Sequence, residues 1–499
     1  MSKQINTNCD TVLKSECDKI CELFPNVWKN ELGTVKDVVI EIKFKKELQP
    51  VFCKPRRIPF SLQKDVDSAI DDGISRGVWK TTDFSDFGTP IVVVHKKGIN
   101  SGIRVCGDYR VTVNKYLEDH RHPIPLPDEL IAQLGGKYFF SKLDLKDAYN
   151  QIRLHPDSQK KLALSTTRGV LLQTRLPFGI KSAPGYFQDV MSKITCDLKG
   201  VVVYFDDILV SGVDRTDHLS NLKSLLNRFN EKGIRLNRDK CVFAEPEITY
   251  LGHIISQNGI TMGPKADDVL KMPRPTNINE LKSFLGAIQF YNKFIENFST
   301  IAGPLYNLTK NDAIFHWSNT QQHAFDHLKQ ILASDQILVH FDQNLPVGIS
   351  CDASNIGIGC VLFHRFKDSS ERPICYASKV LSETQKRYSQ IHKEALAIIF
   401  ALKRFHMFLY GRKFVIITDH KPLVSIFSPS KSTSILTANR LARWVNILNQ
   451  YDFDVEYRHT LLHGNADVLS RFPVGQDKNL RLRRGERRFK RGLSYKFYR

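Results

Sequence analysis

The sequence predicts an α+β unit followed by a separate α/β unit. Between residues 35 and 255, short runs rich in β-branched residues alternate with helical stretches and with Pro and Gly. After Asn344-Leu345-Pro346 the composition changes, and strand and helix patterns alternate. With 499 residues, of which 42% are hydrophobic, the chain is long enough for roughly three domains with packed cores.

The individual elements follow from the spacing of apolar residues. Residues 12–28 place apolar side chains three and four positions apart, which predicts an amphipathic helix that Phe24-Pro25 stops. The strands and helices expected next are strands at 91–94, 201–203 and 248–255, a helix over 279–298 with Asn279 as N-cap, and a helix over 320–333. The elements expected after 344 are two strands, a long helix over 383–409, a strand over 413–418 and more helix.

The charge balance is strongly basic. Lys and Arg outnumber Asp and Glu by 72 to 52, and the last residues, 478–499, hold ten Lys or Arg and one Glu. A nucleic acid is a partner that fits this charge, because Lys and Arg neutralise phosphates. Solubility and an acidic membrane surface are the alternatives that the charge alone leaves open. The first residues are polar, and no apolar run approaches the roughly 18 residues of a membrane span, so we expect no signal peptide and no membrane segment. The ten Cys form no C-x-x-C pair, which argues against a disulfide scaffold and a zinc knuckle. We therefore expect an intracellular chain.

The strongest chemical signal is a cluster of acids in apolar surroundings. Asp206 and Asp207 interrupt the strand-like run V-V-V-Y-F-D-D-I-L-V, which predicts a hairpin with both acids at its tip. Asp144 lies between Leu143 and Leu145 in S-K-L-D-L-K-D-A-Y, so alternation points it away from that apolar pair. Like charges brought together need solvent or a cation, and three carboxylates suit two Mg²⁺ ions that support phosphoryl transfer. An ordinary acidic turn is the alternative for the Asp206-Asp207 segment alone.

A second set of acids lies in the C-terminal unit. Asp352 ends a strand before a Gly-rich turn, Glu394 lies beside the apolar stripe of a helix, Asp419 follows V-I-I-T, and Asp467 falls at a helix start. Each acid alone has a structural explanation as a cap or turn residue. Together the four suit a two-metal hydrolysis site.

Five motifs in order resemble the reverse transcriptases of gypsy-type long-terminal-repeat retrotransposons. They are R-V-C-G-D-Y-R, L-D-L-K-D-A-Y, L-P-F-G-I-K-S-A-P-G-Y-F-Q, Y-F-D-D and Y-L-G-H-I-I-S. The C-terminal acids, with T-D-H-K-P-L and A-D-V-L-S-R, resemble the ribonuclease H domain of the same elements. The resemblance covers about 35–472 and implies an α+β right-hand polymerase (fingers, palm, thumb/connection) followed by an α/β ribonuclease H-like domain.

The resemblance also implies domain boundaries. We expect an N-terminal helical segment at 1–34, fingers and palm at 35–255, thumb and connection helices at 256–343, a ribonuclease H-like domain at 344–472, and a basic, disordered tail at 473–499.

Each matched residue receives a role from the resemblance. The metal-binding catalytic acids would be Asp144, Asp206 and Asp207 in the polymerase, and Asp352, Glu394, Asp419 and Asp467 in the ribonuclease, with two Mg²⁺ or Mn²⁺ ions in each site. Tyr149 would exclude ribonucleotides by crowding the sugar 2′-hydroxyl. The positions that would contact nucleotide, template or primer are Lys96, Lys97, Arg104, Asp147, Ala148, Tyr149, Phe178, Gly179, Leu251 and Gly252. Lys240 aligns loosely with a lysine proposed as general acid, and His459 and His463 receive no role.

The implied function is an RNA-directed DNA polymerase that extends a DNA primer with dNTPs on an RNA template and cleaves the RNA of RNA–DNA hybrids. One alternative is a degenerate or host-retained copy that only binds nucleic acid. Another is an RNA-copying RNA polymerase, against which Tyr149 and the attached ribonuclease argue. No D-S-G or D-T-G protease motif, zinc-binding integrase head or Cys-His box is visible, so we expect other parts of a polyprotein in the full element. We expect a cytoplasmic location in a nucleoprotein particle, with nuclear entry through the basic tail as the alternative.

Overall fold

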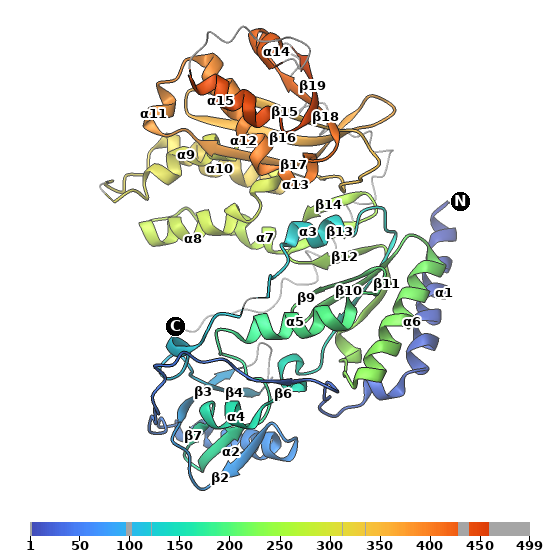
Figure 1. Cartoon of the computed structure of the whole chain (residues 1–499), viewed down its shortest axis with the longest axis vertical. Coiled ribbons are helices and arrows are strands. Elements are labelled where there is room, and N and C mark those ends of the chain that lie inside the picture. The colour runs from blue at the N-terminus through green and yellow to red at the C-terminus, as the bar shows by residue number, and fades with distance from the viewer. Residues whose placement is uncertain are drawn as a thin grey trace. The chain divides into compact units, whose positions relative to one another are not determined.

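The computed structural model describes residues 2–95, 102–120, 122–311, 313–334, 336–427 and 439–458 (Figure 1). The chain divides into two compact units, Met1–Gly263 and Pro264–Arg499. None of the helices in the described ranges has the length and apolar character that a bilayer crossing requires. The basic tail predicted at 473–499 lies outside the described residues.

Two larger sheets organise the first unit. The four-stranded sheet has the order β11-β5-β10-β9; its strands are β5 (Phe139–Asp144), β9 (Val201–Tyr204), β10 (Asp207–Gly212) and β11 (Val242–Glu245). The five-stranded sheet has the order β2-β8-β7-β3-β4; its strands are β2 (Trp79–Thr82), β3 (Thr89–His95), β4 (Ile103–Gly107), β7 (Leu164–Thr166) and β8 (Gly169–Gln173).

Two smaller sheets complete the strand framework described for this unit. In one, β1 (Val39–Ile40) runs parallel to β6 (Arg153–Leu154). The other is a three-stranded antiparallel sheet that contains β12 (Glu247–Tyr250), β13 (His253–Ser256) and β14 (Gly259–Met262).

Helices cover the four-stranded sheet because each has one apolar stripe. In α6 (Arg215–Lys232), which packs on β10, the fully buried apolar residues are Leu222, Leu225, Leu226 and Phe229, at spacings of three and four. Asp214 caps the start of α6 by accepting the Asp217 N–H, and Gly233 ends it with a left-handed φ of 74°. The N-terminal helix α1 (Ser2–Glu22) packs on α6 and β11, while α5 (Ala183–Thr195) packs on β9.

The remaining helices of the first unit are short or lie beside the five-stranded sheet. They are η1 (Pro25–Trp28), α2 (Phe60–Ser75), η2 (Asn114–Tyr116), α3 (Pro127–Ala132), η3 (Ala148–Gln151), α4 (Pro156–Lys161) and η4 (Arg238–Lys240).

The second unit is built on a five-stranded sheet of order β17-β16-β15-β18-β19. Its strands are β15 (Val347–Ala353), β16 (Gly357–Arg365), β17 (Glu371–Val380), β18 (Lys413–Thr418) and β19 (Asp452–Tyr457). Strands β15, β16 and β17 pair antiparallel, whereas β18 runs parallel to both β15 and β19. Its described helices are α7 (Lys265–Leu270), α8 (Ile278–Gln289), η5 (Asn292–Phe294), α9 (Phe298–Asn307), α10 (Asn319–Ala333), α11 (Glu383–Lys386), α12 (Gln390–Arg404), α13 (His406–Leu409), α14 (Lys421–Phe427) and α15 (Asn439–Leu448).

The structure corrects several sequence expectations. The helix predicted over 279–298 ends at Gln289, and its N-cap is Asn277, whose side chain accepts the N–H groups of Asn279 and Glu280. The strand predicted over 248–255 is a hairpin of β12 and β13. Between residue 344 and α11 there are three strands, where the sequence predicted two. The helix predicted over 383–409 is divided into α11, α12 and α13. The predicted domain boundaries stay predictions; residues 255 and 256 both lie in β13, and the compact units divide after Gly263.

Candidate active sites

The backbone of the four-stranded sheet brings the three predicted polymerase acids together. Asp144, the last residue of β5, is the direct cross-strand partner of Asp207, the first residue of β10. Asp206 precedes it in the two-residue turn between β9 and β10. Directly opposed residues in antiparallel strands have Cα atoms only about 4.5–5.5 Å apart. Two segments some 60 residues apart in the sequence therefore supply one acidic cluster.

A buried glutamine fixes the turn that carries Asp206. Phe205, the first turn residue, has a positive φ of 53°, as the tight turns of two-residue hairpins require. Its N–H donates to Gln188 Oε1 at 2.7 Å, and Gln188 Nε2 donates to the Val203 carbonyl at 3.1 Å. Gln188 lies on α5 and is only 1% exposed. This side chain therefore ties the acidic hairpin to the helix behind it.

Two lysines accompany the acids. Lys142 Nζ lies 2.8 Å from Asp207 Oδ1, and Lys240 Nζ lies 3.7 Å from Asp144 Oδ1. Burial raises the pKa of Asp144, and the charges of Asp206 and Asp207 raise it further, while Lys240 and Lys142 oppose this rise. The carboxylates of Asp207 and Asp144 thus each lie beside an ammonium group.

Aromatic residues cluster around Tyr149, which lies near the acid Asp206. The Tyr149 ring lies 4.8 Å from the Phe178 ring and 4.8 Å from the Phe187 ring, centroid to centroid. Burial, with a smaller contribution from the charge of Asp206, raises the pKa of Tyr149 to about 12. The Arg104 guanidinium lies over Phe178, with its carbon 5.4 Å from the ring centroid. The structure therefore connects the predicted sugar gate and the predicted triphosphate-binding arginine through one aromatic ring.

The other predicted contact residues occupy distinctive backbone positions. Asp147 has a left-handed φ of 48°, and its carboxylate pairs with Arg76; Ala148 begins η3. Gly179 has a φ of 93°, and a Cβ there would lie 3.1 Å from the Gly107 carbonyl oxygen. Lys96 and Lys97 lie outside the described residues.

Leu251 and Gly252 form the two-residue turn between β12 and β13. Both have positive φ, 47° and 79°, which is the requirement of a type I′ hairpin. Burial raises the pKa of the preceding Tyr250, and the charge of Asp207 adds to that rise. The turn predicted to contact the primer therefore follows a tyrosine whose pKa is raised by the polymerase acid Asp207.

In the second unit, the parallel pairing of β15 and β18 places Asp352 and Asp419 at matching positions. The register of β15 and β18 pairs Ser350 with Ile417, so Asp352 and Asp419 follow at matching positions. The charges of both acids raise the pKa of Glu394 on α12. These three acids therefore lie near one another at the carboxyl ends of β15 and β18. Asp467, His459 and His463 fall outside the described residues.

Glu394 is the most perturbed acid of this cluster. It is 3% exposed, and burial is the main cause that raises its pKa to about 8. Gln390 donates to its Oε1 and also to the Ala353 carbonyl oxygen. Glu394 Oε2 is buried without a hydrogen-bond partner in the described part of the chain. A buried carboxylate oxygen without a donor suits a bound cation.

The donor chemistry of both clusters fits hard divalent cations, which prefer carboxylate oxygens. Within the described ranges, however, no three His, Cys, Asp or Glu side chains are grouped so that they could hold a metal ion. In the polymerase cluster, Asp207 pairs with Lys142 and Asp144 with Lys240. Binding of cations there requires the carboxylates to leave these lysines.

Sequence reasoning missed three residues that position the acids. Lys142 precedes Asp144 by two residues, and strand alternation alone places both on one face. Gln390 precedes Glu394 by one helical turn, which is also a readable signal. Gln188 ends the recognised L-P-F-G-I-K-S-A-P-G-Y-F-Q motif, but nothing local reveals its bond to Phe205.

Comparison with protein families defines the class of this chain. Residues 94–255 match the reverse transcriptase (RNA-dependent DNA polymerase) family, and residues 317–416 match the RNase H-like domain found in reverse transcriptase. The chain therefore carries an RNA-directed DNA polymerase domain followed by a ribonuclease H-like domain, and the predicted fold class is confirmed.

Over most of its length the chain is similar to retrotransposon polyproteins. The Transposon Tf2-3 and Tf2-7 polyproteins of Schizosaccharomyces pombe are each 32% identical over 443 residues, which is 88% of this chain. The chain spans about a third of their length, 33%.

Solved structures with a similar fold include the foamy viral protease-reverse transcriptase. In its complex with dsDNA, it matches with a TM-score of 0.79 and 23% identity over 90% of this chain and 94% of that chain. In its complex with an RNA/DNA hybrid, the TM-score is 0.74 and the identity 23%, over 94% of this chain and 62% of that chain. At this identity the similarity establishes the fold.

Proposed function

We propose that this chain extends a DNA primer with dNTPs on an RNA template and cleaves the RNA strand of the resulting hybrid, with two Mg²⁺ or Mn²⁺ ions in each site. The cross-strand pairing of Asp144 with Asp207, beside Asp206 in the turn, carries the proposal. The ribonuclease H part is supported by the group of Asp352, Glu394 and Asp419 at adjacent strand ends.

The ions would be held by Asp144, Asp206 and Asp207 in one site and by Asp352, Glu394, Asp419 and Asp467 in the other. When bound, such ions activate an attacking hydroxyl or water and stabilise the leaving oxygen. The chain itself supplies position and charge. Gln188 fixes the position of the acidic turn by accepting the Phe205 N–H, and Gln390 orients the Glu394 carboxylate.

The substrate-facing residues have separable roles in this proposal. Tyr149, held between Phe178 and Phe187, forms a rigid wall where the nucleotide sugar would lie. Arg104, held over Phe178, would engage the triphosphate together with Lys96 or Lys97. The Leu251-Gly252 turn would contact the primer. Lys240, whose Nζ lies 3.7 Å from Asp144 Oδ1, would donate a proton to the leaving pyrophosphate.

Primer extension with oligo(dT) on poly(rA) in Mg²⁺ or Mn²⁺ tests the polymerase, and cleavage of a labelled RNA–DNA hybrid tests the ribonuclease. Asp206→Asn should abolish DNA synthesis but spare RNA cleavage and hybrid binding. Asp352→Asn should abolish RNA cleavage but spare extension, because its acids lie in the other unit. A wild-type chain that binds hybrid yet shows neither activity would instead support the nucleic-acid-binding alternative.

We further propose that the chain is part of a gypsy-type long-terminal-repeat retrotransposon polyprotein that acts in a cytoplasmic nucleoprotein particle. The polyprotein relatives and the net charge of +20 support this proposal. Co-sedimentation of the chain with element RNA in a cytoplasmic fraction would test it. Recovery of the chain in the nucleus without RNA would contradict it.

A further inference from the structure

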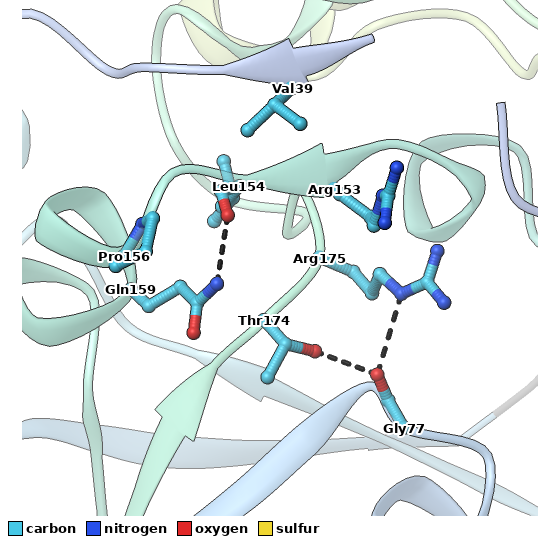
Figure 2. Close-up of a pocket in the computed structure, with 8 residues that line it drawn as sticks. All are labelled: Val39, Gly77, Arg153, Leu154, Pro156, Gln159, Thr174 and Arg175. Carbon is cyan, nitrogen blue, oxygen red and sulfur yellow. Dashed lines mark hydrogen bonds between the residues drawn. The ribbon is translucent and has the colours of Figure 1, made fainter. Parts of the chain in front are cut away.

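The first unit contains an open cavity of about 360 Å³ that the two acid clusters do not explain (Figure 2). Its lining residues are Val39, Gly77, Arg153, Leu154, Pro156, Gln159, Thr174 and Arg175. None of them is acidic, and none belongs to the catalytic or substrate-contact residues named above. The lining combines two arginines with an apolar wall.

The backbone places the two arginines beside each other. Arg153 on β6 pairs with Val39 on one side and forms an antiparallel bridge with Arg175 on the other. Backbone hydrogen bonds on either side hold this bridge: Leu154 N–H donates to the Thr174 carbonyl at 3.0 Å, and Leu176 N–H donates to the Ile152 carbonyl at 2.9 Å. Directly opposed residues in such a ladder project to the same face, and like charges there destabilise the pairing. Figure 2 shows both guanidinium groups on one side of the cavity.

No protein acid balances this charge in the part of the chain that the structure describes. Arg175 Nη1 donates to Thr34 Oγ1 at 2.9 Å, and Arg175 Nε donates to the Gly77 carbonyl at 3.4 Å, so its acceptors are neutral. Across the same ranges Arg153 makes no side-chain hydrogen bond or ion pair. Burial lowers the pKa of Arg175, and the charge of Arg153 lowers it further. An anion between the two groups would relieve this repulsion.

We propose that this cavity binds a phosphoryl group through Arg153 and Arg175, with the carrier of that group against Val39, Leu154 and Pro156. Guanidinium groups offer paired donors that match phosphoryl oxygens in a fork geometry. The cavity volume of about 360 Å³ exceeds that of a lone inorganic anion, and the apolar wall accommodates the attached sugar or base. The phosphoryl group can belong to a free phosphate compound or to the backbone of a bound nucleic-acid strand.

The first arm of the test uses the full chain in EDTA, so that neither metal centre is assembled, and titrates it with pyrophosphate by calorimetry at low salt. Arg153→Gln is the principal variant, because the side chain is exposed and has no protein bond in the described ranges to lose. Lys223→Gln is the matched control, since Lys223 is an exposed cation on α6 and does not line the cavity. We expect Arg153→Gln to weaken pyrophosphate binding about tenfold or more and Lys223→Gln to leave it unchanged.

The second arm uses a short single-stranded oligonucleotide without terminal phosphates. If the strand backbone is a source of the phosphoryl group, Arg153→Gln should weaken binding and reduce the slope of log K against log salt by about 0.7. In whichever arm Arg153→Gln weakens binding, Arg175→Lys should weaken it less. Lys keeps the positive charge and loses only the paired donors of the guanidinium group. Weaker binding by Arg153→Gln in either arm supports the site, and the arm in which it occurs identifies the source of the phosphoryl group. Equal behaviour of Arg153→Gln and Lys223→Gln in both arms overturns it. Primer extension by the wild type is measured separately and bears only on the polymerase proposal.

Discussion

Replacement of Gln188 by Met should uncouple the acidic turn from its helix without removing any acid. Met fills a similar volume but cannot accept the Phe205 N–H or donate to the Val203 carbonyl. Gln188 also donates to Ser192 Oγ, so three bonds are lost and the half-buried Phe205 N–H is left unpaired, which should reduce the free energy of unfolding by about 2–4 kcal/mol. Displacement of Asp206 by a fraction of an ångström should slow primer extension about 10- to 100-fold.

The assay compares urea unfolding, primer extension and RNA cleavage on the same preparation. RNA cleavage should stay at the wild-type rate, because its acids lie in the second unit. Gln173→Met is a matched control: Gln173 is also buried, at 3% exposed, and bonds Trp79 Nε1 and the Arg175 carbonyl instead of the turn. It should lose similar stability but keep the extension rate per folded molecule. Wild-type extension by Gln188→Met, or an equal loss in Gln173→Met, would refute the reasoning.

Three further predictions concern the sugar gate and two buried titratable groups. Tyr149→Val should admit ribonucleotides by removing the wall beside Phe178, measured as the ratio of dNTP to rNTP incorporation; an unchanged ratio would place the gate elsewhere. Burial lowers the pKa of His218, bonded to Ser141, from 6.5 to about 4. Because the unfolded state then binds more protons, stability should fall as pH falls from 6.5 to 4, by roughly 3 kcal/mol, and His218→Gln should flatten this dependence in denaturant melts. Glu394 should give the opposite pH dependence of stability. Because its pKa is raised to about 8, the metal-free chain should become less stable as pH rises from 4.5 to 8. Glu394→Gln should remove that loss and also abolish RNA cleavage; a melting curve with the wild-type pH dependence would contradict the assignment.

The sequence predicted the acidic turn because its signal is local. Asp206 and Asp207 interrupt a strand-like apolar run, so the hairpin and its exposed tip follow from neighbours alone. The bond between Gln188 and Phe205 joins a helix to a turn 17 residues away, which no local period encodes. In the second unit, Asp352 and Asp419 could be assigned to strands from the sequence, but their alignment at matching positions depends on the β15–β18 register.

The over-extended helix has a different cause. Tyr291 and Ile295 continue the apolar spacing of α8 and are buried at 1% and 0% exposed, yet they flank the 3₁₀ turn η5 as its N-cap and C-cap. Apolar spacing reports which side chains are buried, and several backbone conformations satisfy the same burial. Asn297, with a φ of 51°, then redirects the chain into α9.

The pairing of β5 with β10 makes the catalytic geometry depend on two apolar residues. Leu143 and Ile208 are cross-strand partners, both 0% exposed, and each adjoins an acid. A slip of one residue between these strands would put Ile208 opposite Asp144, in the partly exposed place of Asp207. The cost of exposing that side chain, about 2 kcal/mol or more, opposes the slip. Substitutions that shorten Leu143 or Ile208 should therefore impair synthesis as active-site variants do, although neither side chain carries a charge or a ligand atom.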